Sequence, residues 1–402
     1  MDRTATRPGH SATRNNLNAQ RTALIVGAGI GGLAAGVSLV RAGWNIRICE
    51  RAANPSELGF ALALAPNAIA AIDELGLSSA SIGAGLTAMR FELRHLDGRV
   101  IRRFGAPPAG VGIIALRSAL HGQLLAAVGS GPLVLASEVV DFGEEVGGVL
   151  LKLKDGRVER GEFLVGADGV RSVIRKGLHS AEPPPTPSGF YALRGLARGV
   201  ADHFGNLAAV GYFGEGIEAA AARASENAVY WYLSLLAKDL ESSPREPWRI
   251  VQRLTATGVD PWFRAIVAVT DPSEMRLDEL FVRPPLRHWG VGRVTLLGDA
   301  AHPVLPHTGQ GAAQALEDAV ALGLVLREAG DISAALREYE RVRSIRTRRL
   351  IAMGPRIARM TTTRSPVRKM IRTALIRLVP ESLVLRAARA KDPHRELRRP
   401  GA

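Results

Sequence analysis

The sequence has one cysteine and few aromatic residues, and each scarcity excludes a class of protein. Cys49 has no partner for an internal disulfide, and no cysteine pair exists to hold a structural zinc. Aromatic residues make up 5% of the chain, too few to identify a stacking box. No charge-free apolar run reaches about 18 residues, and residues 1–20 lack the apolar core of a signal peptide. We therefore expect a cytoplasmic protein with a disordered leader over residues 1–20.

The composition is otherwise that of a folded protein with more than one domain. Hydrophobic residues make up 47% of the 402 residues, and charged residues make up 22%. A disordered chain would be poorer in apolar residues and richer in charge. The length exceeds that of an average domain, so we expect two or three units.

Positive charge is concentrated at the C-terminal end. The chain carries 52 Lys and Arg against 38 Asp and Glu, which gives a net charge of +14. Residues 341–402 alone hold 18 of the basic residues and three acidic ones, a net charge of +15. The preceding residues therefore sum to −1, and the basicity belongs to the C-terminal stretch. No DNA-reading helix of a known type is present, so a nucleic-acid partner is not indicated.

The first motif follows the leader. An apolar run at 22–26 is followed by a glycine-rich turn at 27–32, a helical pattern at 33–42 and a second apolar run at 44–50. This order predicts a βαβ unit that opens a parallel sheet.

The glycine turn matches a dinucleotide-binding pattern. Gly27 permits a tight turn, Gly29 lets backbone N–H groups approach a pyrophosphate, and Gly32 allows close packing of helix and strand. Glu50 follows Gly32 by 18 residues, where a carboxylate accepts hydrogen bonds from ribose hydroxyls and repels a 2′-phosphate. The site therefore suits FAD or NAD rather than NADP. We assign these residues of the turn to cofactor binding: Gly27, Gly29, Ile30, Gly31 and Gly32.

Further elements extend this unit into a mixed α/β chain. Four more strand-like runs cover 131–136, 148–154, 162–167 and 292–297. Helical patterns cover 67–75, 116–128 and 311–327. After a proline-rich break at 183–187, β-type runs without long helices between them cover 190–199, 207–213 and 228–236. We interpret this middle part as an antiparallel insert. The helix-like stretch that contains Gly216 and Ala219 is short, so we interpret it as a loop.

Two later motifs indicate a family. Gly-Ala-Asp-Gly-Val-Arg-Ser at 166–172 and Leu-Leu-Gly-Asp-Ala-Ala-His-Pro at 296–303 each follow a strand-like run. In order and spacing the chain resembles the group A, single-component FAD-dependent aromatic monooxygenases of the p-hydroxybenzoate hydroxylase fold. It is most similar to their salicylate, 3-hydroxybenzoate and urate hydroxylase branch.

The resemblance implies a fold in which a Rossmann-like FAD-binding domain carries an inserted, mostly antiparallel substrate domain. On this basis the FAD-binding domain comprises 21–78, 106–182 and 286–345, and the substrate domain comprises 79–105 and 183–285. Residues 346–402 form a basic helical C-terminal extension. The class is therefore α/β with a C-terminal helical tail.

The resemblance also implies cofactor contacts. Asp299 is expected at the flavin ribityl and pyrophosphate groups, and Asp168 at FAD and the path of NAD(P)H. Arg117 is expected near the FAD phosphates or the flavin edge, although an arginine at a helix start is often only solvated. Arg51 could neutralise a phosphate. The loop residues Gly309, Gln310 and Gly311 lead into a helix whose N–H groups would face the isoalloxazine.

The implied reaction uses NADH or NADPH to reduce FAD, after which O2 yields a flavin C4a-hydroperoxide that hydroxylates an activated ring. Arg194 and Tyr212 could bind a carboxylate or phenol from the insert, and His307 is the candidate closest to the substrate. Tyr230 and Tyr232 share one sheet face opposite Trp231, so either the pair or the tryptophan faces the pocket.

The basic extension contains an amphipathic helix at 366–378. Its apolar residues recur at helical spacing, and its basic residues lie mostly off that stripe. This helix could rest on an anionic membrane surface, or it could dock on the body or on a second copy of the chain. A peripheral membrane contact is therefore one alternative, and the chain is expected to be a monomer or a homodimer. The expected partner is a small aromatic substrate. The alternative function is an epoxidase, reductase or hydroxylase of a prenyl, quinone or polycyclic substrate at a membrane.

Overall fold

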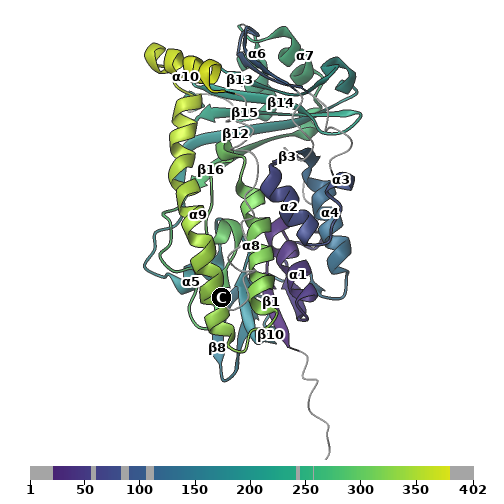
Figure 1. The fold of residues 1–402 in the computed structure, drawn as a ribbon, viewed down its shortest axis with the longest axis vertical. Helices are drawn as coiled ribbons and strands as arrows, with labels where there is room; N and C mark the ends of the chain where they lie inside the picture. The colour runs from purple at the N-terminus through teal and green to yellow at the C-terminus, as the bar shows by residue number, and fades with distance from the viewer. Residues whose placement is uncertain are drawn as a thin grey trace, which may run out of the picture.

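The computed structural model describes residues 21–55, 60–82, 90–105, 113–240, 245–256 and 258–380. The predicted leader and residues 381–402 lie outside these ranges. The described part has a dinucleotide-type sheet with its helices at one end and a large antiparallel sheet at the other, joined along one side by a long helix (Figure 1).

A five-stranded parallel sheet forms the base of the molecule. Its strand order is β17-β11-β1-β2-β7, and every pair in it is parallel. The strands are β1 (Thr22–Val26), β2 (Asn45–Cys49), β7 (Leu133–Val134), β11 (Phe163–Gly166) and β17 (Val294–Leu296). Four of the five residues of β1 are buried, as expected for a central strand covered on both faces.

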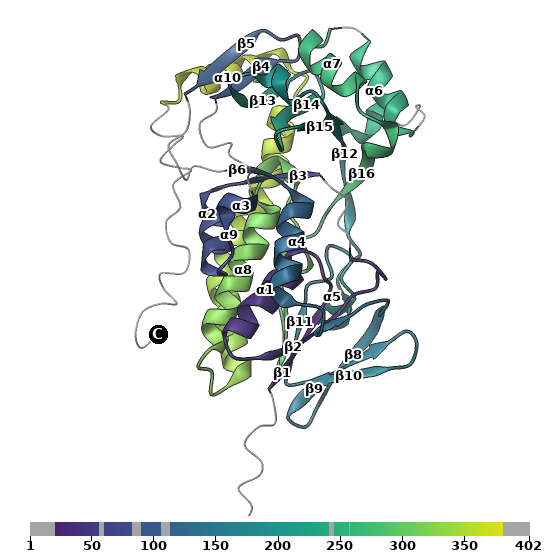
Figure 2. The ribbon, with the colours of Figure 1, turned by 90° about the vertical axis from the view of Figure 1, so that its right-hand side faces the viewer.

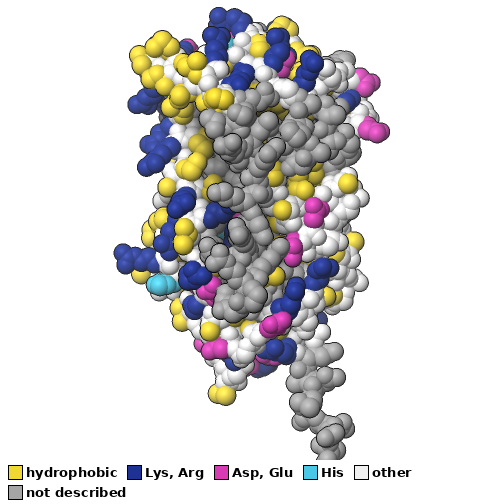
Figure 3. All heavy atoms as spheres, viewed as in Figure 1, with side chains coloured by type: hydrophobic (Ala, Val, Ile, Leu, Met, Phe, Trp, Pro, Cys, Tyr) yellow, Lys and Arg dark blue, Asp and Glu magenta, His cyan; other side chains and the backbone are white. Residues whose placement is uncertain are grey.

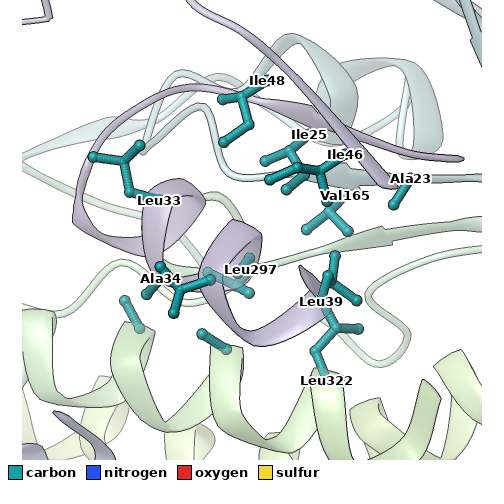
Figure 4. Close-up of a cluster of buried hydrophobic side chains, with 14 of the residues drawn as sticks. Ala23, Ile25, Leu33, Ala34, Leu39, Ile46, Ile48, Val165, Leu297 and Leu322 are labelled. Carbon is teal, nitrogen blue, oxygen red and sulfur yellow. The ribbon is translucent and has the colours of Figure 1, made fainter. Parts of the chain in front are cut away.

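Helices cover this sheet and form the larger hydrophobic core. Helix α1 (Ile30–Arg41) packs between the sheet and α8 (Gly311–Leu326), and it also contacts α4 (Arg117–Val128). Figure 4 shows the apolar side chains of β1, β2 and β11 on one side of α1, near its Leu33, Ala34 and Leu39, and Leu322 of α8 on the other side, below Leu39. This core fixes α1 against the end of β1, where the glycine turn lies.

Two smaller sheets and short helices complete this part. An antiparallel sheet of order β10-β9-β8 projects below it (Figure 2). Its strands are β8 (Val139–Glu145), β9 (Gly148–Leu153) and β10 (Val158–Gly161). A second pair joins β3 (Ala61–Leu64) to β6 (Ile113–Leu116). The short helices are α2 (Pro66–Glu74), α3 (Ser79–Ile82) and α5 (Val173–Leu178), with 3-10 turns η5 (Gly298–Ala300) and η6 (Pro306–Thr308).

A seven-stranded sheet forms the other end, in the order β16-β12-β15-β14-β13-β4-β5. All its pairs are antiparallel except that of β13 with β4. The strands are β4 (Arg90–His95), β5 (Val100–Phe104), β12 (Thr186–Arg198), β13 (Leu207–Phe213), β14 (Ile217–Arg223), β15 (Ala228–Leu236) and β16 (Met275–Val282). Helices α6 (Pro247–Thr255) and α7 (Pro261–Ala268) cover one face, and their residues Ile250 and Phe263 are buried in its core. The remaining 3-10 turns are η2 (Ala201–Phe204), η3 (Ala237–Asp239) and η4 (Pro272–Glu274).

The chain ends in two helices that link both parts. Helix α9 (Ile332–Thr361) runs from the parallel sheet to the large sheet, and α10 (Pro366–Leu378) crosses beside β5 (Figures 1 and 2). Within the described residues, every helix is too short or too polar to cross a membrane.

The structure confirms the α/β architecture with an antiparallel sheet and a helical C-terminal region. Two predictions of detail were wrong. The stretch read as a loop with Gly216 and Ala219 is strand β14, since pairing with β13 and β15 outweighs the helix propensity of its alanines. Helices α6 and α7 follow the predicted β-type runs of the insert, in a stretch for which the sequence predicted no element. The boundary placed at 345/346 falls inside the continuous helix α9.

Candidate active site

The glycine turn between β1 and α1 excludes side chains at two positions. Gly27 has φ +100°, and a Cβ atom there would lie 2.7 Å from the carbonyl oxygen of Ala167 on the neighbouring strand end. A Cβ atom on Gly32 would lie 1.9 Å from the carbonyl oxygen of Gly27. Both glycines therefore allow α1 to begin directly against the sheet. The first-turn N–H groups after Gly29 lack partners within the helix and can bind an anionic ligand.

Glu50, directly after β2, holds this turn through both carboxylate oxygens. The Ala28 N–H donates to Oε2 at 2.8 Å, and the Ala52 N–H donates to Oε1 at 2.9 Å. Each oxygen keeps a second lone pair that can accept a ribose hydroxyl. The side chain is half-buried beside the glycine turn, as the dinucleotide prediction requires.

The substitution Glu50→Gln is expected to weaken FAD binding by about 10- to 100-fold. The amide keeps one acceptor oxygen but places an NH2 group against a backbone N–H, and a hydrogen bond to a charged group contributes about 1.5–3 kcal/mol. Titration of apoprotein with FAD, followed by flavin fluorescence, measures the change. The matched control is Glu328→Gln, which removes the same charge at an exposed position. Equal FAD affinity in the two variants would contradict the assigned role of Glu50.

Asp168, after β11, has one structural and one unused oxygen. Its Oδ2 accepts the N–H of Val173 at 2.7 Å, with a longer contact of 3.4 Å to the N–H of Ile174, so it fixes the start of α5. Its Oδ1 is buried and hydrogen-bonds to no described residue. Burial raises the pKa of this carboxyl group. Asp168 is therefore a turn residue with one oxygen left for a ligand.

Asp299 lies in η5, at the end of β17. Its surface is accessible to solvent, and protein atoms surround its carboxyl group. Burial by these atoms raises its pKa, while the charges of His302 and Arg117 oppose that rise. No hydrogen bond joins the carboxylate to a described residue, so both oxygens can accept ligand hydroxyls.

Arg117 is the first residue of α4 and lies where the two parts of the molecule meet. Burial lowers the pKa of its guanidinium group, and the negative charge of Asp299 counteracts this. Arg194, Arg276 and Asp278 of the large sheet also act on Arg117 electrostatically. Arg117 is thus within electrostatic range of the dinucleotide crevice and of the sheet.

The loop before α8 is fixed by hydrogen bonds to the side chain of Gln310. Gly309 adopts the left-handed conformation with φ +63°, and Gly311 begins the helix. The side-chain oxygen of Gln310 accepts hydrogen bonds from Asn67 at 3.0 Å and Gln314 at 3.1 Å. The Gln310 side chain is therefore engaged within the protein, which leaves the backbone of this loop for the predicted cofactor contact.

A buried ionic cluster lies beneath this loop. His302 contacts Asp318 Oδ2 at 2.5 Å, and Arg343 donates from Nε to Asp318 Oδ1 at 2.7 Å and from Nη1 to Glu317. All four side chains are at most 1% exposed. The sequence shows Arg343 only as one of the basic residues of 341–402, and the fold shows that α9 places it in the core.

Tyr212 lies on the opposite face of the sheet from Arg194, so the prediction that it binds a carboxylate or phenol was wrong. Its side chain is fully buried on the sheet face that packs under α6 and α7. Its hydroxyl donates to Asp260 Oδ2 at 3.0 Å, and its ring packs on Phe263. Trp231 lies on the same face, where it donates to Thr270. Of the two alternatives, the tyrosine pair therefore faces the dinucleotide-binding part.

That opposite face presents Arg194, Tyr230 and Tyr232. Arg194 pairs with Tyr232 across β12 and β15, and Tyr230 packs near Phe60 at 6.3 Å between ring centroids. Arg194 is half-buried and makes an ion pair with Asp278 at 4.0 Å, without a hydrogen bond to any described residue. Its donors are therefore available to a ligand. Burial raises the pKa of Tyr230 to about 12, so that hydroxyl stays protonated at neutral pH.

Sequence analysis missed two polar residues of this face, Glu218 and Ser234. Glu218 Oε1 accepts the hydroxyl of Tyr232 at 2.5 Å, and Ser234 bonds His307 at 2.7 Å. Strand alternation on β14 and β15 would have indicated both, but β14 was not recognised as a strand.

His307 in η6 is enclosed, with its side chain 1% exposed. Its Nε2 contacts Ser234 Oγ, and its ring packs edge-on against Phe190 at 5.2 Å. Burial lowers its pKa, so the ring is neutral at pH 7. The imidazole therefore joins the loop before α8 to the sheet, and its role beside the substrate stays a prediction.

Arg51 is exposed and lies beside Glu138, Lys154 and Asp155 around a shallow surface hollow. Its contact with a cofactor phosphate stays a prediction.

These residues form the two walls of the candidate site, which come within electrostatic range of each other at Arg117. One wall is the dinucleotide site, from the glycine turn to Asp299, and the other is the sheet face with Arg194 and the tyrosine pair. The first can hold a dinucleotide along the carboxyl ends of parallel strands. The second can hold a planar anionic compound between aromatic rings and a guanidinium group.

Comparison with known proteins agrees with this geometry. The family model described as the FAD binding domain matches residues 20–353. The aurachin C monooxygenase/isomerase of Stigmatella aurantiaca is 32% identical over 372 residues, which cover 90% of this chain and 95% of that protein. The FAD-dependent urate hydroxylase of Klebsiella pneumoniae is 29% identical over 344 residues, 82% of this chain and 87% of that protein.

A solved structure shares the whole fold. The crystal structure of Klebsiella pneumoniae HpxO complexed with FAD and uric acid superposes with a TM-score of 0.83 at 26% identity. The match covers 92% of this chain and 95% of the other.

Proposed function

Since the chain belongs to the FAD-binding domain family, we propose that this flavoprotein monooxygenase hydroxylates an anionic aromatic or heteroaromatic small molecule with NAD(P)H and O2. Its relatives include a urate hydroxylase and the aurachin C monooxygenase/isomerase, which support the class of reaction and the class of substrate. Which substrate binds depends on the residues of the sheet face with Arg194 and the tyrosine pair.

The residues of the dinucleotide site fit FAD. The unpaired carboxylate of Asp299 and the free Oδ1 of Asp168 are polar atoms without protein partners among the described residues. The side-chain-free turn at Gly27 and Gly32 leaves room for a pyrophosphate, and Glu50 offers lone pairs to a ribose. When bound there, FAD supplies reduction by NAD(P)H and activation of O2.

One observation carries the choice of substrate. Arg194 is half-buried on the sheet face beside Tyr232, and its charge acts on Arg117 together with that of Asp299 from the dinucleotide side. A ligand beside the flavin would therefore meet Arg194, whose donors make no hydrogen bond to a described residue. A carboxylate, phenolate or enolate is the group that a guanidinium binds in a charge-assisted, bidentate manner.

The protein's own groups bind, orient and shield this compound. Arg194 would fix the anionic group, and the rings of Tyr230 and Tyr232 would lie against the aromatic plane and exclude water. The Tyr232 hydroxyl stays protonated, since burial raises its pKa well above the ordinary value, and it donates to Glu218. The N-terminal N–H groups of α8 would stabilise negative charge on the isoalloxazine.

The substitution Arg194→Gln is expected to raise KM for the anionic substrate by about 10- to 100-fold, because a hydrogen bond to a charged group contributes about 1.5–3 kcal/mol. Bound FAD should stay at the wild-type level, since Arg194 lies on the other wall. Steady-state NAD(P)H oxidation measures the change. Arg198→Gln, at the exposed end of the same strand, is the matched control and should leave KM unchanged. An unchanged KM in Arg194→Gln would refute the substrate assignment.

The test of the function is a substrate panel. The purified protein is mixed with NADH or NADPH, anaerobically and in air, together with phenolic acids, purines and neutral analogues that lack the acidic group. We expect anionic rings to accelerate flavin reduction and neutral analogues to do so at least tenfold less. If bound FAD were reduced only in the presence of a neutral lipophilic compound, the result would favour the alternative function, in which the enzyme acts on a prenyl, quinone or polycyclic substrate at a membrane. The hydroxylases among the relatives do not support that alternative.

Location and assembly are proposals as well. We place the enzyme in the cytoplasm, because its single cysteine is a free, buried thiol and proteins of oxidising compartments more often carry disulfides. The oligomeric state, monomer or homodimer, stays a prediction. A peripheral membrane contact through the C-terminal region stays a prediction too, and it depends on helix α10.

A further inference from the structure

Helix α10 is attached to the body through its polar residues. Arg372 is buried and donates from Nη1 to the carbonyl oxygens of Met360 at 3.3 Å and Thr361 at 2.7 Å. Its guanidinium also lies over the ring of Phe213, 4.6 Å from the centroid. Lys369 forms an ion pair with Glu215. The orientation of the helix is therefore fixed by basic side chains that point inward.

The C-terminal end of α10 is fixed in the same manner. Arg102 of β5 donates to the carbonyl oxygen of Ile376 at 2.6 Å and to that of Val379. At the other end Ser365 caps the first turn, and Arg364 pairs with Asp239 at 2.7 Å. Both ends of the helix are thus tied to the substrate-domain side of the molecule.

This attachment turns the apolar stripe of α10 toward solvent. Its large apolar side chains are between 44% and 78% exposed, and Figure 3 shows hydrophobic side chains gathered over this helix. They are Val367, Met370, Ile371, Leu375 and Leu378. An amphipathic helix on a globular protein normally buries such a stripe, and none of the described residues covers this one.

The exposed stripe continues into a hollow of about 820 Å³ between α10 and the sheet. Met370 and Leu378 of the stripe line this hollow, and so does the neighbouring Ala374. Arg377 lies at the same hollow, together with two ion pairs, Arg99 with Asp97 and Lys369 with Glu215.

The charge of the region selects the occupant. Residues 341–380 contain 12 Lys and Arg and no Asp or Glu. A second copy would bring an equally basic helix against this one, and residues 381–402 also carry a net charge of +3. Either occupant would place further positive charges beside those of α10, which is electrostatically unfavourable. A surface that combines an apolar interior with negative head groups satisfies both features of α10.

We propose that α10 docks this enzyme on anionic membrane surfaces, with its apolar stripe among the acyl chains and its arginines at the phosphate head groups. Arg368 and Arg377 are exposed on the helix beside the stripe and are placed for that contact. The proposal concerns a surface separate from the candidate site and holds whatever the substrate is.

Vesicle sedimentation of the full-length, FAD-loaded protein tests the proposal. We expect binding to vesicles of phosphatidylcholine with one quarter phosphatidylglycerol, at least tenfold weaker binding to phosphatidylcholine alone, and release by 0.5 M salt. The triple variant Met370→Ser, Leu375→Ser, Leu378→Ser should bind at least tenfold less, with unchanged FAD content and thermal unfolding. The matched control replaces three exposed valines elsewhere, Val146→Ser, Val269→Ser and Val291→Ser, and should bind like the wild type.

A second measurement shows which face meets the lipid. The native thiol of Cys49 is 1% exposed, so Leu375→Cys can be labelled selectively with an environment-sensitive dye. Anionic vesicles should shift its emission to the blue, whereas the same dye on Val146→Cys should not respond. A wild-type protein that ignores anionic vesicles, or a triple variant that binds like the wild type, would overturn the proposal. Concentration-dependent dimers that the triple variant loses, without lipid binding, would assign the stripe to a second copy and overturn it too.

Discussion

Gly32→Ala is expected to leave the protein without bound FAD. The added Cβ atom would lie 1.9 Å from the carbonyl oxygen of Gly27, and that oxygen belongs to backbone held by the sheet. Helix α1 must therefore shift away from the end of β1, which displaces the N–H groups that would bind the pyrophosphate. We expect FAD affinity to fall at least about 100-fold, which corresponds to about 2.8 kcal/mol.

The control for this variant is Gly122→Ala. Gly122 lies within α4, and a Cβ atom there would have no neighbour within 4 Å. Alanine favours the helix by about 0.8–1.0 kcal/mol over glycine, so this variant should keep its FAD and be as stable as the wild type or more so. FAD content after gel filtration and the far-ultraviolet circular dichroism spectrum separate loss of binding from loss of fold. A Gly32→Ala protein that retains stoichiometric FAD would refute the assigned geometry of the turn.

Arg343→Met is expected to cause the largest loss of stability, about 3–5 kcal/mol in the free energy of unfolding. Methionine fills a similar volume but leaves the carboxylates of Asp318 and Glu317 buried without their cation. Removal of one partner from a buried ion pair costs about this much, because the remaining charge is neither hydrated nor paired. Arg349→Met, on the exposed side of the same helix, should change stability by at most about 0.5 kcal/mol.

The pH dependence of unfolding provides an independent check of this cluster. Burial alone would raise the pKa of Asp318, but His302 and Arg343 lower it to about 2. Because the folded-state pKa is below the ordinary value, the contribution of Asp318 is fully present above about pH 4 and is lost as pH falls toward 2. Urea unfolding of the wild type should therefore show this loss of stability between pH 4 and 2, and Arg343→Met should show less of it. The same slope in both proteins would show that Arg343 does not hold Asp318 ionised.

Local motifs made the dinucleotide-binding part predictable. The turn at Gly27 and Gly32 and the carboxylate of Glu50 are separated by one helix and one strand, so their spacing in the sequence determines their position in space. The strand at 217–223 was misread because alanine favours helices and only the neighbouring strands, distant in sequence, impose the extended conformation.

The orientation of side chains could not be predicted in the same way. Alternation along β15 separates Tyr230 and Tyr232 from Trp231, but it does not say which face meets the cofactor. Tyr212 is in the same situation, since α6 and α7 decide which face of the sheet they cover. Arg343 is surrounded in sequence by exposed arginines, and its partners lie on α8, so tertiary packing alone distinguishes it from its neighbours.

The source of the oxygen atom in the product tests the central claim most directly. The protein is incubated with its substrate and NAD(P)H under 18O2 in ordinary water, and the product is analysed by mass spectrometry. We predict one labelled oxygen atom per product molecule and one molecule of NAD(P)H oxidised for each product formed. Product that carries unlabelled oxygen under 18O2, and takes up label from H2 18O instead, would contradict the assignment of this chain as a monooxygenase.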